Sequence, residues 1–188
     1  MRSRRMQAAS LRSRLRRRGL CAIVAPMDLP PHGSIDLLLA NAAATLALGQ
    51  RIGAGLHTGA IVYLAGGLGM GKTTFARGVI AAWTGEAQPD APSPTFTLAQ
   101  TYEGPSGVLT HADLYRLNRP EETLELGLDE AAEDGALLVE WPERLGRFSS
   151  PAAAWLSFFD PPEGRAGRRL RIANAPHLHA LAQDFRLP

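Results

Sequence analysis

The sequence predicts a single α/β domain, built as a three-layer sandwich around a mainly parallel central sheet with antiparallel additions. Two observations lead to this fold class. Short β-branched and apolar runs alternate with helical segments along the chain, and the apolar runs are continuous, as in strands buried on both faces. The length of 188 residues suits one domain with a substantial core and leaves little room for two.

Helix caps, hydrophobic periodicity and helix-breaking residues predict where each helix and strand begins and ends. Ser34 is an N-cap candidate for a first helix, and glycines close that helix. Three prolines mark an aperiodic loop over 84–94, and glycines at 104 and 107 suggest a hairpin. The expected helices span 34–56, 71–83, 119–134 and 175–185, and the expected strands span 59–66, 95–102, 107–115, 136–141, 152–160 and 168–174.

Charge is distributed unevenly along the chain. Residues 1–26 carry eight arginines and no acid, and removing these charges from the formal net +2 leaves −6 for the rest. This tail fits a nucleic-acid-binding arm, an Arg-rich targeting peptide or an extension upstream of a misassigned start. We expect a disordered or non-native extension over 1–26, with Met27 as the true start and one domain over 27–188.

Composition excludes several classes of protein. No apolar run approaches the roughly 18–20 residues of a membrane span, so no membrane role is expected. The only cysteine, Cys21, rules out an internal disulfide framework and fits a reducing, cytoplasmic location. The five histidines show no metal-ligand spacing.

A phosphate-binding motif stands between a predicted strand and a predicted helix. Gly66-x-x-x-x-Gly71-Lys72-Thr73 matches G-x(4)-G-K-[ST], in the context that this motif requires. Its backbone N–H groups and the helix N-terminus would cradle phosphates, Lys72 would reach the β and γ phosphates, and Thr73 would ligate Mg²⁺. The domain is therefore expected to be P-loop NTPase-like. The residues expected to contact the nucleotide here are Gly66, Gly69, Met70, Gly71, Lys72, Thr73 and Thr74.

Lysine usage supports this interpretation. Nineteen of the twenty basic side chains are arginine, and Lys72 is the single lysine. A compact ammonium fits a tight phosphate cradle that a planar guanidinium does not. Guanine-selective P-loop proteins usually carry N-K-x-D, which a chain without a second lysine lacks, so ATP is the expected nucleotide.

Two acids end predicted strands. Glu140 ends the apolar run "ALLVE", and Asp113, in "HADLYRL", lies at the end of another predicted strand, so both should lie at the carboxyl edge of the sheet, where ligands bind in open α/β folds. Each could serve the metal or the attacking water, and each could equally cap the turn that follows it. The stretch "SPTFT" over 93–97 has the position of a switch loop, although such stretches are often plain loops.

Five motifs in this order resemble the TsaE family: "GGLGMGKTTFARG", "SPTFTL", "HADLYRL", "GLDE" and "VEWPERL", within roughly residues 41–172. These are small bacterial ATPases of tRNA threonylcarbamoyladenosine synthesis. The resemblance implies slow ATP hydrolysis with the partner subunits TsaB and TsaD, where TsaD carries the transfer to the adenosine beside the anticodon. Direct tRNA binding is not expected, because the acidic domain lacks a basic stripe.

The resemblance also assigns residues. It makes Thr73 and Glu140 the Mg²⁺ ligands and Asp113 an essential acid near the metal. It places Ser93 and Thr95 in the switch loop. Two weaker matches, Thr45 and Arg168, would lie near the nucleotide, although a helix hydroxyl and a surface arginine explain them as well.

One position departs from the family pattern. The family usually has an acid after the first loop glycine, and this chain has Gly67. The backbone cradle needs no side chain there, so we expect altered turnover rather than lost binding. Two alternatives stay open, a P-loop small-molecule kinase and a nucleotide-gated binding module with little turnover.

Overall fold

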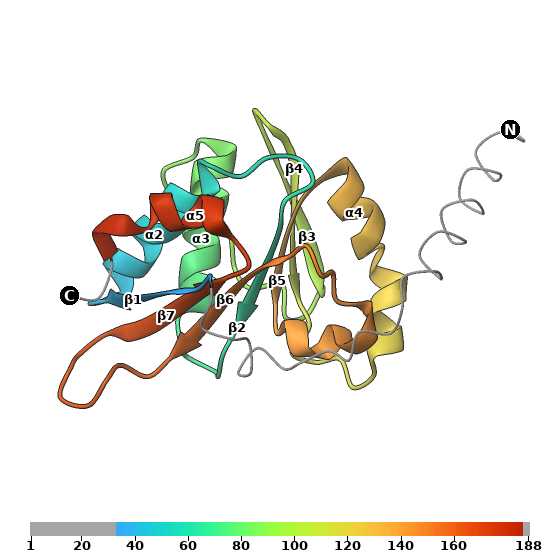
Figure 1. Ribbon diagram of the computed structural model, residues 1–188. Helices are drawn as coiled ribbons and strands as arrows, with labels where there is room; N and C mark the ends of the chain where they lie inside the picture. The colour runs from blue at the N-terminus through green and yellow to red at the C-terminus, as the bar shows by residue number, and fades with distance from the viewer. Residues whose placement is uncertain (1–32, 186–188) are drawn as a thin grey trace, which may run out of the picture.

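A seven-stranded mixed sheet organises the described residues, 33–185, of a computed structural model (Figure 1). The strand order is β1-β7-β6-β2-β5-β4-β3. The expectations for residues 1–26 and for a start at Met27 lie outside the described residues. The strands are β1 (Ile35–Leu39), β2 (Ile61–Ala65), β3 (Ala99–Gly104), β4 (Gly107–Asp113), β5 (Gly135–Glu140), β6 (Ala154–Phe159) and β7 (Arg168–Ala173).

Four central strands, β6-β2-β5-β4, are mutually parallel, and β3, β7 and β1 join antiparallel to their neighbours. The expected parallel sheet with antiparallel additions is therefore confirmed. Glu140, the last residue of β5, pairs with Leu64 of β2 on one side and Asp113 of β4 on the other. The carboxyl ends of three strands thus meet at one edge of the sheet.

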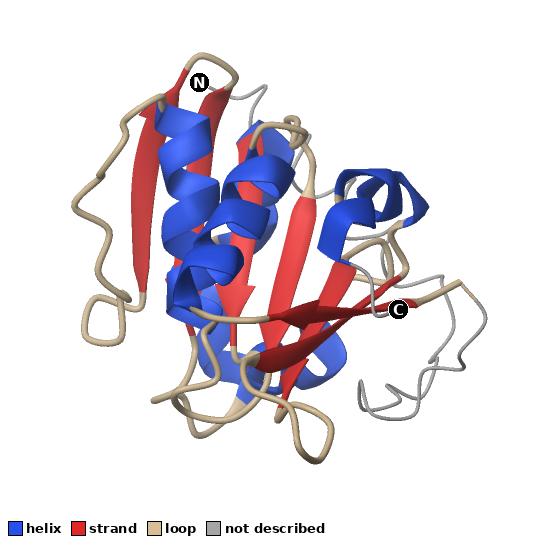
Figure 2. Cartoon of the chain, turned by 90° about the vertical axis from the view of Figure 1, so that its left-hand side faces the viewer, coloured by secondary structure: helices blue, strands red, loops and turns tan. Residues whose placement is uncertain are grey.

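Helices cover both faces of the sheet, as a three-layer sandwich requires (Figures 1 and 2). The α-helices α2, α3 and α5 lie on one face, and α4 lies on the other with two short 3-10 segments, η2 and η3. The bounds are α2 (Ala42–Gly53), α3 (Lys72–Thr84), η2 (Pro120–Leu126), α4 (Leu128–Asp134), η3 (Pro142–Phe148), α5 (Pro176–Leu181) and η4 (Gln183–Phe185).

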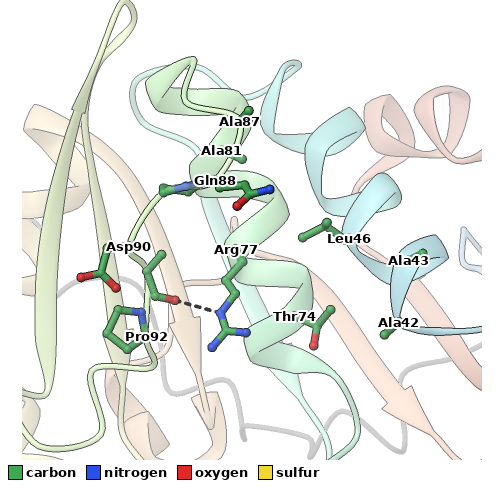
Figure 3. A pocket seen from close by; sticks show the side chains of 12 residues that line it. Ala42, Ala43, Leu46, Thr74, Arg77, Ala81, Ala87, Gln88, Asp90 and Pro92 are labelled. Carbon is green, nitrogen blue, oxygen red and sulfur yellow. Dashed lines mark hydrogen bonds between the residues drawn. The ribbon is translucent and has the colours of Figure 1, made fainter.

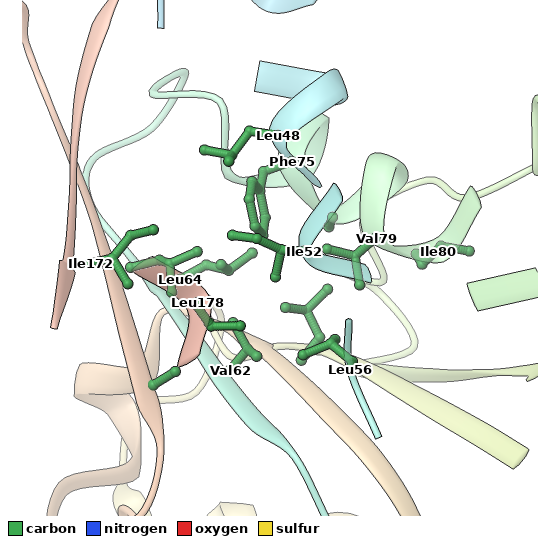
Figure 4. Close-up of a cluster of buried hydrophobic side chains, with 14 of the residues drawn as sticks. Leu48, Ile52, Leu56, Val62, Leu64, Phe75, Val79, Ile80, Ile172 and Leu178 are labelled. Carbon is green, nitrogen blue, oxygen red and sulfur yellow. The ribbon is translucent and has the colours of Figure 1, made fainter. Parts of the chain in front are cut away.

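Two apolar cores follow from the alternation of side chains along the central strands. In β2, Val62 and Leu64 face α2 and α3, whereas Tyr63 faces the opposite core under α4. Figure 4 shows the larger core, where Phe75 and Val79 of α3 pack between the sheet and α2. This packing holds α3, and with it the residues at its N-terminus, in a fixed position over the sheet.

The single helix expected over 34–56 is wrong. Residues Ile35–Leu39 form β1, which pairs antiparallel with β7, and the helix begins only at Ala42. Leu37 and Leu39 are fully buried in this pairing. The N-cap is Asn41 rather than Ser34, and its side chain accepts the Ala44 N–H at 2.9 Å.

Other boundaries also differ from expectation. Gly127, with a φ of 62°, divides the helix expected over 119–134 into η2 and α4. The hairpin is confirmed, with Gly104 opposite Gly107, but its first strand starts at Ala99 because 95–97 form a turn. The closing helix ends at Leu181 and is followed by η4.

Within residues 33–185, no helix has the length and apolar character to cross a bilayer.

Candidate functional site

The phosphate loop, residues 66–71, joins β2 to α3 at the carboxyl edge of the sheet. Gly66, Gly69 and Gly71 have φ angles of 131°, 71° and 101°, which favour glycine. A Cβ on Gly66 would lie 2.6 Å from the Phe158 carbonyl oxygen, so this position also requires close backbone approach. Gly71 is the N-cap of α3 and offers no side chain, which leaves the first N–H groups of the helix to bind an anion.

Lys72 is held inside this loop. Its side chain is buried, and Nζ donates to the carbonyl oxygens of Gly66 at 2.7 Å and Gly67 at 2.8 Å. The ring of Trp141, whose φ is 60°, covers the ammonium with Nζ 4.0 Å from its centroid. Burial lowers the pKa of Lys72, and the carboxylates of Glu140, Glu143 and Asp113 oppose that shift.

Thr73 and Glu140 meet beside Lys72. The Thr73 hydroxyl donates to Oε2 of Glu140 at 3.2 Å, and Glu140 is almost completely buried. A hydroxyl and a carboxylate are oxygen ligands of the kind that Mg²⁺ prefers, and Mg²⁺ commonly keeps waters and phosphate oxygens as its other ligands. The pair therefore fits the metal expected from the sequence. Among the described residues, no group of three or more His, Cys, Asp or Glu side chains could hold a metal ion, so a site here would also need phosphate oxygens and waters as ligands.

His111 is part of this cluster, and no sequence pattern described above predicted it. Its side chain is fully buried, and Nε2 lies 3.1 Å from Oε1 of Glu140. In β4, His111 lies two residues before Asp113 and opposite Leu138, so it shares a face with Asp113 and Glu140. Strand alternation around Asp113 was the signal that could have found it.

Asp113 anchors the segment 93–97 through hydrogen bonds, and we call this set of contacts the Asp113 clasp. Its Oδ2 accepts the Ser93 hydroxyl and, at 2.7 Å, the Thr95 hydroxyl, while Oδ1 accepts the Tyr115 N–H at 3.0 Å. The segment closes through Leu98, whose φ is 65° and whose carbonyl accepts the Asp113 N–H at 2.9 Å. Ser93 and Thr95, which were expected in a switch loop, thus both hydrogen-bond to Asp113.

An aromatic contact connects this clasp to the phosphate loop. The ring of Tyr115 lies 4.9 Å from that of Trp141, measured between centroids, and Trp141 covers Lys72. At the outer end, the exposed Phe96 stacks under the guanidinium of Arg116 at 4.0 Å. The clasp and the lysine therefore belong to one contiguous set of contacts.

Of the remaining predicted site residues, some lie close to the phosphate loop, and one has no hydrogen bond or ion pair to it among the described residues. Thr45 of α2 is buried, and its Cγ2 would lie 3.6 Å from a Cβ on Gly71, which places it against the end of the phosphate loop. Met70 packs against the larger core. Arg168 begins β7 and donates to the Gly167 carbonyl at 2.7 Å. Across residues 33–185, no hydrogen bond or ion pair joins Arg168 to the loop.

A pocket of about 490 Å³ adjoins the first turns of α2 and α3 (Figure 3). Thr74 and Arg77 of α3 line it on one side and Leu46 of α2 on another, and Ala87–Pro92 close it. Arg77 Nε donates to the Ala91 carbonyl at 3.1 Å, which fixes this loop to α3. Thr74 immediately follows Thr73, so the pocket and the phosphate loop are adjacent.

Comparison with known proteins gives consistent matches. Residues 39–166 match the family model described as threonylcarbamoyl adenosine biosynthesis protein TsaE. The chain is 41% identical over 115 residues to the tRNA threonylcarbamoyladenosine biosynthesis protein TsaE of Rickettsia felis, covering 61% of this chain and 67% of that protein. The protein of the same name from Rickettsia bellii is 51% identical over 83 residues, covering 44% of this chain and 57% of its own length.

A solved structure is similar over most of the described fold. The crystal structure of Bacillus subtilis YdiB aligns with a TM-score of 0.62 and 25% identity, covering 81% of this chain and 93% of that chain. The sheet, the loop between β2 and α3, and this neighbour together give a P-loop NTPase-like fold.

Proposed function

Because the chain belongs to the TsaE family, we propose that it binds ATP with Mg²⁺ and hydrolyses it slowly, as a subunit required for threonylcarbamoyl modification of tRNA. The modified base is the adenosine next to the anticodon. The relatives named above carry this pathway in their names, and the aligned region covers 57–67% of their lengths.

One observation carries the proposal. A glycine loop that ends in a buried lysine lies beside a hydroxyl and a carboxylate 3.2 Å apart. A cation and free helix N–H groups suit phosphate oxygens, whereas a hydroxyl paired with a carboxylate suits a hard divalent cation. A polyphosphate bound together with Mg²⁺ satisfies both halves of the site.

The side chains then have distinct tasks. The loop N–H groups bind the phosphates and Lys72 neutralises their charge, while Thr73 and Glu140 hold Mg²⁺. When bound, Mg²⁺ supplies neutralisation of the charge that develops on the phosphate oxygens. Both carboxylate oxygens of Asp113 already accept hydrogen bonds, from the Ser93 and Thr95 hydroxyls and from the Tyr115 N–H. We therefore assign Asp113 the task of holding the segment 93–97 over the site.

The pocket beside Thr74 is our proposed place for the nucleoside of ATP. Its volume of about 490 Å³ lies within the usual range for small-molecule sites, and Thr74, Arg77 and Asp90 provide polar groups. Replacing Leu46 with tryptophan should fill this pocket. We expect Leu46→Trp to weaken ATP binding while leaving binding of inorganic triphosphate unchanged, as measured by isothermal titration calorimetry. Equal loss for both ligands would contradict the assignment.

The proposed partners are TsaB and TsaD, and we propose that the chain contacts tRNA only indirectly, through the complex with them. The chain beyond its first 26 residues carries a formal charge of −6, which disfavours a direct contact with a phosphate backbone. We place the activity in the cytoplasm, together with its tRNA substrate.

ATP turnover by the purified chain, alone and with a TsaB–TsaD pair, tests the proposal. We expect slow hydrolysis alone, faster hydrolysis with the partners, and loss of both in Lys72→Ala. A rate of ATP hydrolysis that does not change when TsaB and TsaD are added would contradict the role in tRNA modification. Transfer of the γ-phosphate to a metabolite would favour a small-molecule kinase, and full function of Glu140→Ala would favour a binding module without useful turnover.

A further inference from the structure

His111 is a fully buried polar side chain that the proposed function leaves without a task. It lies in β4 two residues after the fully buried Leu109, which belongs to the larger core, and its imidazole contacts the carboxylate of Glu140 at 3.1 Å. Burying an imidazole in place of an aliphatic side chain disfavours folding unless its polar atoms are used. The contact with Glu140 is therefore the feature to explain.

The hydrogen-bond partners of the His111 ring indicate which of its nitrogens carries the proton. Nδ1 of His111 is buried and has no hydrogen-bond partner among the described residues. An N–H at this position would be an unsatisfied buried donor, which is less favourable than an unshared lone pair. The proton therefore belongs on Nε2, which donates it to Oε1 of Glu140.

The two carboxylate oxygens of Glu140 are consequently divided between two donors. Oε1 accepts from His111, and Oε2 accepts from the Thr73 hydroxyl. With Oε1 anchored, rotation of the carboxylate is restricted, and Oε2 stays on the side of the phosphate loop. A second donor of this kind typically fixes the orientation of a metal-binding carboxylate.

We propose that His111 is a positioning residue, which holds Glu140 in the orientation needed to bind the Mg²⁺ of a nucleotide complex. The proposal rests on the function proposed above, in which Glu140 is a metal ligand. It requires a donor at Nε2, whereas a purely structural role requires only a side chain of similar volume.

Three substitutions separate the two roles. His111→Gln keeps an amide N–H near the position of Nε2, His111→Met keeps the volume without a donor, and His111→Asn keeps an amide that is too short to reach Oε1. His57→Gln is the matched control, because His57 is exposed and its side chain bonds only the neighbouring Thr58 carbonyl. Thermal unfolding of each variant without nucleotide reports on folding.

The readout is the affinity for a fluorescent ADP analogue in EDTA and across a Mg²⁺ titration of the full chain. We expect His111→Met and His111→Asn to require roughly 10–100-fold more Mg²⁺ for the half-maximal effect. Their affinity in EDTA, and both properties of His111→Gln and His57→Gln, should stay within about threefold of the unsubstituted chain.

The two hypotheses fail in different ways. If Mg²⁺ leaves ADP affinity of the unsubstituted chain unchanged, the proposed metal site is wrong and the role of His111 falls with it. If Mg²⁺ acts on the unsubstituted chain but His111→Met and His111→Gln respond alike, the metal site stands and the positioning role is overturned. Should His111→Met fail to fold, the comparison of His111→Gln with His111→Asn decides in the same way.

Discussion

The Thr73 hydroxyl lies 3.2 Å from Oε2 of Glu140, although 67 positions separate the two residues in the sequence. They meet because β2 and β5 are neighbouring parallel strands, with Leu64 in register with Glu140. Thr73 follows β2 through the phosphate loop, and Glu140 ends β5. The geometry of the proposed metal site is therefore set by the sheet, before any ligand binds.

This arrangement predicts that the Thr73 side chain acts only when Mg²⁺ is present. Thr73→Ala should weaken ADP binding in Mg²⁺ by at least about tenfold and leave binding in EDTA unchanged. Thr73→Ser keeps the hydroxyl and should bind like the unsubstituted chain in both buffers. Calorimetric titration measures both affinities. Equal weakening of the alanine variant in the two buffers would mean that Thr73 contacts phosphate rather than metal.

The buried ammonium predicts a pH dependence of nucleotide affinity. Burial lowers the pKa of Lys72 in the free protein, and bound phosphate should raise it again. Between these two pKa values the free protein has lost the proton that the complex retains. Affinity should therefore fall as pH rises through this window, by up to about tenfold per pH unit. Calorimetry in buffers of different ionisation enthalpy should detect proton uptake on binding, and proton release would contradict the prediction.

The clasp at Asp113 predicts a local change in stability. Asp113→Ala leaves the Ser93 and Thr95 hydroxyls and the Tyr115 N–H without their acceptor. We expect a loss of about 1–3 kcal/mol in unfolding free energy and faster hydrogen exchange over 93–98. Glu133→Ala, at an exposed position of α4, is the control and should change neither. Uniformly faster exchange across the sheet would point to a global rather than a local role for Asp113.

Adjacent glycines of the phosphate loop should respond differently to alanine. A Cβ on Gly66 meets the Phe158 carbonyl oxygen at 2.6 Å, whereas a Cβ on Gly67 meets only Met70 side-chain atoms at 3.7 and 3.9 Å. Gly66→Ala should therefore destabilise the chain by about 1–3 kcal/mol or more. Gly67→Ala should stay within about 0.5 kcal/mol of the unsubstituted chain. Urea unfolding compares the two, and similar losses would be inconsistent with the loop geometry.

Gly67 also departs from the family pattern, in which an acid usually follows the first loop glycine. The same open surroundings accommodate an aspartate at this position. We expect Gly67→Asp to keep ATP affinity, since the cradle uses backbone N–H groups, and to change the rate of hydrolysis. Steady-state turnover and calorimetry check the two parts. If the variant matches the unsubstituted chain in both, the side chain at this position has no role.

Sequence patterns anticipated the features that depend on neighbouring residues. The glycine loop, β2, α3 and the strand ending in Glu140 follow from local motifs and apolar runs, and all are present. The approach of Thr73 to Glu140 follows from parallel strands, which bring their carboxyl ends to one edge of the sheet, whereas their proposed joint role as Mg²⁺ ligands came from the resemblance to the TsaE family.

Features that depend on distant pairing were missed. The run Ile35–Leu39 is leucine-rich and precedes an alanine-rich helix, so local propensity favours one long helix. Its pairing with β7, where Ile35 lies opposite Ile172, makes it a strand instead. His111 was missed for a similar reason, since its meeting with Glu140 depends on the register between β4 and β5.

Thr73 and Glu140 are proposed to hold the metal of a nucleotide bound in the phosphate loop. A crystal structure of the full chain with ADP and Mn²⁺, recorded with anomalous data, tests this proposal most directly. We predict an anomalous peak about 2.1 Å from the Thr73 hydroxyl, with the Glu140 carboxylate reaching the ion directly or through one water, and with the ADP phosphates against Gly66–Thr73. A manganese ion held by other side chains, or ADP phosphates bound outside the loop, would contradict the proposed metal site.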